Sequence, residues 1–187
     1  MVTKEIIQKY VYIPDLETKI KNYISNFDTC SRFNSKNYEK AKPTEQIYKT
    51  IEYLAANAMG PMEITKNNST HILLYVCPAS KFVIAHAMPD LTSKSIVNSL
   101  QQVKASYTLP RILRTDVAKY WNAKEVEQYL QTNQVQHSIS TSGNSTGNAF
   151  AERYQRTFQT VIGKLLLDFP FSQWDQILPE AIRSINQ

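Results

Sequence analysis

The segment "YLAANAMGPMEITKNNSTHILLYVCPASKFVIAHAM", residues 53–88, contains three apolar runs that predict three consecutive β-strands. The second run, "THILLYVC", and the third, "KFVIAHAM", are both rich in strand-forming residues. Only the turn-forming sequence "PAS" separates them, which predicts a hairpin. The first run ends at a Gly-Pro break. Three strands in succession predict an antiparallel meander.

After this segment the apolar residues recur every three or four positions, which is typical of helices. The pattern predicts helices at 93–107, 123–132 and 150–167, with the short strands "RILRTD" and "VQHSIS" between them. The sequence "TSGNSTGN", residues 141–148, has the composition of a loop. A last helix is predicted in "FSQWDQILPEAIRSINQ", despite Pro179. This order predicts an α/β protein with a ribonuclease H-like fold, a five-stranded mixed sheet flanked by helices.

The N-terminal residues differ from this core in composition. An amphipathic stripe follows Pro14 and predicts one helix; its members are Leu16, Ile20, Tyr23, Ile24 and Phe27. Residues 31–46 are polar and basic and contain Pro43, which is typical of a linker. We therefore predict a small helical appendage with its linker at residues 1–42 and the core at residues 43–187.

The composition of the chain limits the cellular compartments and the kinds of partner that we expect. The chain has 187 residues and a net charge of +5, which is compatible with nucleic acid but also with an ordinary solvated surface. Cys30 and Cys77 are too few and too far apart for a disulfide framework, so a reducing compartment is expected. No apolar run reaches the roughly 18 residues of a membrane span. We expect an intracellular protein, nuclear or cytoplasmic, without a membrane partner.

Two carboxylates stand at positions that can converge in space. Asp116 ends the fourth predicted strand, and Glu152 lies near the start of the long helix, with 35 residues between them. Carboxylates are the ligands that Mg²⁺ prefers, and two such ions can drive phosphoryl transfer. The alternative is that Asp116 caps a turn and Glu152 is a solvated helix residue.

Several motifs resemble the integrases of retroviruses and retrotransposons, most closely those of the Ty3/gypsy type. They are "LPRILRTDVAKYWNAKEVEQYL", "AERYQRTFQTVIGKLL" and "WDQILPEAIRSIN", together with the 35-residue gap. Residues 10–36, "YVYIPDLETKIKNYISNFDTCSRFNSK", are similar to the end of the zinc domain that precedes the integrase core. The resemblance covers nearly the whole chain. It implies DNA integration, which is a polynucleotidyl transfer that uses Mg²⁺ or Mn²⁺ held by Asp116 and Glu152.

One departure from the family pattern concerns the first acidic ligand. The family has an Asp three residues before the Gly-Pro, and this chain has Asn57 there. Glu52 and Glu63 are the nearest acids, and both lie too far along the chain to replace it. An amide oxygen can bind a metal but carries no charge. The resemblance therefore implies a weakened metal site and an enzyme that is impaired or inactive.

Other departures concern the zinc domain and the surroundings of the acids. Cys30 is kept, but Phe33 replaces the second cysteine and no His pair precedes it, so no zinc is expected. The pair Val117-Ala118 replaces the usual Asn-Gly after Asp116.

The resemblance also implies contacts with DNA and with further copies of the chain. The long helix carries Arg153, Arg156 and Lys164, and Lys119 follows the second acid. In the family this helix follows the DNA end, and positive groups there contact phosphates. The alternative is a solvated helix face. A homodimer or higher oligomer is expected, because integrase cores commonly associate.

Two functions remain open at this stage. The chain is either an integrase-like transferase with a weakened site or a domesticated, non-catalytic module for DNA binding or protein assembly. A nuclease of the ribonuclease H type shares the fold but lacks the "AERYQRT" helix pattern.

Overall fold

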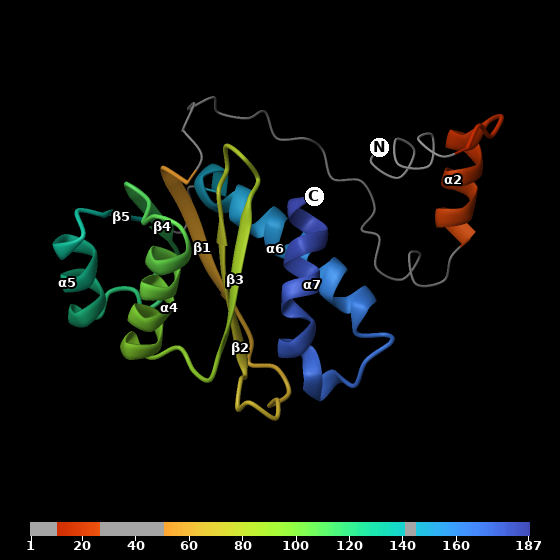
Figure 1. Ribbon diagram of the computed structural model, residues 1–187. Coiled ribbons are helices and arrows are strands. Elements are labelled where there is room, and N and C mark those ends of the chain that lie inside the picture. The colour runs from red at the N-terminus through yellow and green to blue at the C-terminus, as the bar shows by residue number, and fades with distance from the viewer. Residues whose placement is uncertain (1–10, 27–50, 141–144) are drawn as a thin grey trace. The chain divides into compact units, whose positions relative to one another are not determined.

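The computed structural model describes residues 11–26, 51–140 and 145–187 and divides the chain into two compact units, Met1–Ala41 and Lys42–Gln187. The described part of the first unit contains helix α2 (Leu16–Asn26), as the amphipathic stripe predicts (Figure 1). Cys30, Phe33 and the linker lysines lie outside the described residues. The interpretation of residues 1–42 as a zinc-domain remnant therefore stays a prediction.

The second unit is built on the predicted five-stranded mixed sheet. Its strands are β1 (Tyr53–Met59), β2 (His71–Val76), β3 (Val83–Met88), β4 (Ile112–Thr115) and β5 (Gln136–Ile139). They are arranged in the order β3-β2-β1-β4-β5. The pairs β1–β2 and β2–β3 are antiparallel, whereas β1–β4 and β4–β5 are parallel. Short turns suit antiparallel neighbours, and parallel neighbours need the longer crossovers that helices provide.

Two hydrophobic clusters cover the two faces of this sheet. The helices α4 (Ser93–Ser106) and α5 (Lys124–Thr132) pack on one face over residues such as Leu73 and Leu113. The helices α6 (Ser145–Leu165) and α7 (Trp174–Asn186) pack on the other face over residues such as Leu74 (Figure 1). Strand side chains alternate between faces, so the nearly continuous apolar sequence of β2 supplies both clusters.

The prediction of a loop over residues 141–148 was wrong at its C-terminal end. Helix α6 begins at Ser145, five residues before the predicted start at Phe150. Ser, Thr, Asn and Gly are typical of loops, but Ser, Thr and Asn are also common where a helix begins. Composition alone therefore places this boundary too late.

Helix α7 is fixed to the sheet at both ends. At its start, after a short 3-10 turn (Phe171–Gln173), the indole Nε1 of Trp174 donates to the carbonyl of Glu63 at 2.8 Å. At its end, the amide of Asn186 accepts from the backbone N–H of Val83 at 2.8 Å and donates to its carbonyl at 2.9 Å. The two bonds of Asn186 occupy the backbone groups of Val83 at the start of β3, the edge strand of the sheet, where another strand could otherwise pair. The helix also continues through Pro179, which is exposed.

None of the described helices is both long enough and apolar enough to span a membrane.

Gly60 ends β1 in a backbone conformation that other residues rarely adopt, with φ +132. A Cβ atom built there would lie 2.7 Å from Cδ2 of His71 and 2.8 Å from the carbonyl oxygen of Thr70. The replacement Gly60→Ala should therefore lower the free energy of unfolding by about 1–3 kcal/mol. Urea denaturation followed by circular dichroism measures this change. Gly163→Ala is the control, because Gly163 lies within helix α6, where alanine is favoured. Equal stability of the Gly60→Ala variant and the parent would contradict the prediction.

Candidate active site

The parallel pairing of β1 with β4 brings Asn57 and Asp116 to the same level. The last paired residues are Ala55 and Arg114. Asn57 and Asp116 each lie two residues further along their chains, where the two strands reach the same edge of the sheet. Carboxyl ends of parallel strands are a common place for ligand sites. The two residues that the sequence singles out are thus neighbours in the fold.

Asn57 points to the face of the sheet that α6 and α7 cover. Its partner across β2 is Leu74, which belongs to the cluster on that face. The amide Nδ2 of Asn57 donates a hydrogen bond to Oε1 of Gln155 on α6. Glu152 lies one turn before Gln155 on the same helix, about 4.5 Å along its axis. The side chain of Glu152 lies outside the described part of the structure.

Asp116 follows β4 and is held by its own turn. Its Oδ1 accepts a hydrogen bond from the backbone N–H of Ala118 at 3.1 Å. This bond caps the turn, as expected from the alternative in which Asp116 is a turn-capping residue and not a metal ligand. The hydroxyl of Thr115 donates to the carbonyl of Asp116 at 3.0 Å and lies 2.9 Å from Nε2 of His137. Burial lowers the pKa of His137. Because the bond from Ala118 uses only Oδ1, the other carboxylate oxygen can still meet a ligand.

Tyr120 is electrostatically linked to Asp116. Burial, and then the negative charge of Asp116, raise the pKa of Tyr120 to about 12. The phenol is therefore neutral at physiological pH and can donate a hydrogen bond near the carboxylate.

Arg114 is a further residue of this site that the sequence motifs did not single out. It lies two residues before Asp116, and its strand neighbours Leu113 and Thr115 are buried towards the other face of the sheet. Arg114 therefore lies on the face of Asn57. Its Nε atom is buried and has no hydrogen-bond partner among the described residues. The alternation of "RILRTD" would have placed it there, but no family motif drew attention to it.

The described side chains at this edge are too few and too weakly acidic, taken alone, to hold a pair of divalent cations. The described side chains supply the carboxylate of Asp116, the neutral amide of Asn57 and the positive guanidinium of Arg114. Within the described ranges, no three His, Cys, Asp or Glu side chains gather in a way that could hold a metal ion. A pair of such ions normally needs several carboxylates to offset its charge.

The predicted DNA-binding residues lie along α6 and beside Asp116. Arg153 and Arg156 are exposed on α6, Lys164 is half-buried near the end of that helix, and Lys119 is exposed in the turn after Asp116. The structure does not gather these four residues at one point, because Lys164 lies eleven residues beyond Arg153 on the helix.

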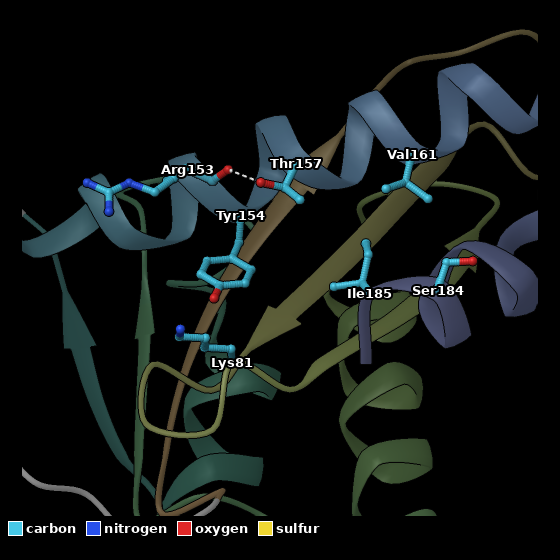
Figure 2. A pocket seen from close by; sticks show the side chains of 7 residues that line it. All are labelled: Lys81, Arg153, Tyr154, Thr157, Val161, Ser184 and Ile185. Atoms are coloured by element: carbon cyan, nitrogen blue, oxygen red, sulfur yellow. Dashed lines mark hydrogen bonds between the residues drawn. The ribbon is translucent and has the colours of Figure 1, made fainter. Parts of the chain in front are cut away.

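Arg153 instead lines a pocket of about 540 Å³ between α6, the end of α7 and the β2–β3 turn. Figure 2 shows Lys81 and Tyr154 there, with the hydroxyl of Tyr154 directed towards the amine of Lys81. The hydroxyl of Thr157 is bonded to the carbonyl of Arg153 at 3.2 Å. Burial raises the pKa of Tyr154, and nearby Arg153 partly offsets this effect. Lys81 was not predicted as part of this surface, because it is far from α6 in sequence.

The comparison with known sequences finds one relative, and no protein-family model matches the chain. The chain is similar to the Gag-Pro-Pol polyprotein of Squirrel monkey retrovirus, with 23% identity over 155 residues. The similar region covers 78% of this chain and 8% of that polyprotein, so the chain spans only a small part of its relative.

Several solved structures have a similar fold, among them the following two. The first is the HTLV-2 integrase catalytic core domain in complex with magnesium, in its trimeric form. It has a TM-score of 0.61 and 17% identity, over 74% of this chain and 86% of that one. The second is a chain of the simian T-cell lymphotropic virus intasome in complex with PP2A regulatory subunit B56 gamma. It has a TM-score of 0.68 and 19% identity, over 91% of this chain and 60% of that one. At these identities the likeness is one of fold.

The geometry predicts that one substitution strengthens metal binding. Asn57→Asp adds a negative charge level with Asp116, and should raise the affinity for Mn²⁺ at least about tenfold, or ~1.4 kcal/mol. Isothermal titration with Mn²⁺ measures this without any assay of activity. Asn98→Asp is the matched control, because Asn98 is exposed on α4, on the other face of the sheet. An equal gain in both variants would attribute the effect to overall charge and contradict the prediction.

Proposed function

We propose that this chain, whose core has the fold of retroviral integrase catalytic domains, is a retrotransposon-derived DNA-binding protein with impaired DNA-joining activity. The observation that carries the proposal is the meeting of three elements at one edge of the sheet. Asn57 on β1 lies level with Asp116 after β4 and is bonded to Gln155 on α6, one turn from Glu152. This is the arrangement that the resemblance to integrases implies, with an amide in place of one acid.

The proposed catalytic residues are Asp116 and Glu152, with Asn57 as a weakened third. Polynucleotidyl transfer requires an activated hydroxyl and a stabilised leaving oxygen, and metal ions supply both. In the proposed site the carboxylates number two instead of three, and Arg114 adds a positive charge close by. Asp116 and Glu152 are the residues that would hold Mg²⁺ or Mn²⁺, and we expect that binding to be weak. We expect no zinc.

The proposed partner is DNA, contacted by Arg153, Arg156, Lys164 and Lys119. The exposure of Arg153, Arg156 and Lys119 and the net charge of +5 support this proposal. Lys81, across the pocket from α6, adds a cation to the same surface. Such contacts with phosphates position DNA without reading its sequence.

We also propose that the protein is a homodimer or higher oligomer. The connection between α6 and α7 exposes three large apolar side chains, Leu167, Phe169 and Phe171. Exposed apolar groups that cluster in this way are common where proteins associate. Among the similar structures, the HTLV-2 core is trimeric. We place the protein inside the cell, in the nucleus or the cytoplasm.

The second candidate function is a domesticated, non-catalytic module for DNA binding or protein assembly. The observation that favours it is Arg114, since a positive guanidinium two residues before Asp116, with its Nε buried and unbonded, opposes the binding of cations. Both candidates share the fold and differ in whether catalysis survives; a module for protein assembly would in addition not need DNA as its partner.

An assay of Mn²⁺-dependent strand joining, and of the reverse reaction on branched DNA, separates the two candidates. We expect the Asn57→Asp variant to join strands about 10- to 100-fold faster than the parent. Loss of a polar neighbour changes the affinity or activity of metal sites on this scale. Glu152→Gln in the Asn57→Asp background should abolish the gain.

Activity of the parent that Glu152→Gln removes would mean that two carboxylates suffice, and would contradict the proposed impairment. Inactivity of both the parent and folded Asn57→Asp would favour the non-catalytic module.

A further inference from the structure

Arg114 lies on the same face of the sheet as Asn57, between small neighbours on the adjoining strands. In the sheet its neighbours are Ala55 on β1 and Ser138 on β5, and both side chains are small. No bulky side chain at these two positions therefore covers the guanidinium. The residue is only half-buried, so a ligand in solution can reach part of it.

One nitrogen of the guanidinium lacks the hydrogen-bond partner that a buried donor requires. Its Nε is buried without a hydrogen bond, and no ion pair joins Arg114 to Asp116, although Asp116 lies only two residues further along the chain, just after β4. By contrast, Arg111 at the other end of β4 is paired with Glu52, with Nε 3.0 Å from Oε1. A buried donor without an acceptor destabilises the free protein, and a ligand that supplies an acceptor removes this cost.

The described charges around Arg114 sum to zero and therefore permit an anion to approach. The positive charge of Arg114 cancels the negative charge of Asp116, while Asn57 and Gln155 are neutral and bonded to each other. A phosphate group approaching this edge is therefore not repelled by the described residues. The planar guanidinium is the side chain best suited to hold a phosphate, because two of its N–H groups can bind two oxygens.

We propose that Arg114 binds a phosphate of the DNA backbone directly at the edge formed by Asn57 and Asp116, without a bridging metal ion. This inference rests on the proposed partner, DNA, and identifies a residue through which the candidate site contacts it. In a two-metal site the cations neutralise the phosphate. In this chain the arginine supplies positive charge from the protein itself, so DNA binding does not require Mg²⁺.

The test is fluorescence anisotropy of a labelled duplex, titrated with the full chain over a range of salt concentrations, in EDTA and in Mg²⁺. We expect Arg114→Gln to weaken binding about tenfold in EDTA and to lower the slope of log Kd against log salt by about 1. Arg111→Gln is the matched control, because it removes the same charge from the same strand at the far end. We expect its effect to be less than about twofold.

A second variant tests the electrostatic argument by adding a negative charge instead of removing a positive one. Asn57→Asp places a negative charge beside Arg114, and should weaken binding to the duplex in EDTA although it strengthens the binding of Mn²⁺. If Arg114→Gln does not fold, Arg114→Lys decides. It keeps the charge but loses the two-pronged geometry, and we expect it to bind several-fold more weakly than the parent, with an unchanged salt slope.

The outcomes separate this inference from the proposed function. A parent that does not bind the duplex in either buffer would overturn the DNA-binding function itself. Two outcomes would overturn the role of Arg114 and leave DNA as the partner. One is that the parent binds the duplex only in Mg²⁺; the other is that folded Arg114→Gln binds it in EDTA as tightly as the parent does. Equal losses in Arg114→Gln and Arg111→Gln would also overturn it, because they would indicate a general effect of charge.

Discussion

The parallel pairing of β1 with β4 is the constraint on which the rest of the site depends. It joins segments that are far apart in sequence, and its register places Asn57 beside Asp116. A shift of one residue would turn one of the two side chains to the opposite face, because strand residues alternate between faces. The register is itself held by apolar residues such as Leu54 and Leu113, which are buried in the same cluster. Packing on one face of the sheet therefore positions the polar groups on the other.

Helix α6 depends on the same sheet for its position. Phe158 and Ile162 are buried in the cluster with Met59 and Leu74, which fixes the helix across β1 and β2. Gln155 lies one turn before Phe158 and reaches Asn57 from this anchored position. The hydrogen bond between Asn57 and Gln155 is thus a consequence of apolar packing further along the helix. Two neutral amides satisfy each other there, where a carboxylate would carry a charge in partly buried surroundings.

The fold was more predictable than the site because it depends on local patterns. Apolar alternation and the change to a helical period predicted all five strands and the described helices, and the fold class is confirmed. The start of α6 was missed because its first residues resemble a loop. Gln155, Lys81 and Arg114 were also missed, because their surroundings depend on which strands pair and which helix crosses them. Asn57 and Asp116 could be named only because motifs of a known family marked their positions.

Asn57 and Arg114 act in the same direction on the electrostatics of one edge. An amide at position 57 carries no negative charge where an acid would, and the arginine two residues before Asp116 adds a positive charge. Each residue weakens the attraction for a divalent cation, and each also lowers the repulsion of a phosphate. A site that needs metal ions to approach DNA would lose both functions together if its charge fell. A site with its own guanidinium can lose the metal and keep the DNA, so under the proposed function the loss of catalysis would not entail the loss of DNA binding.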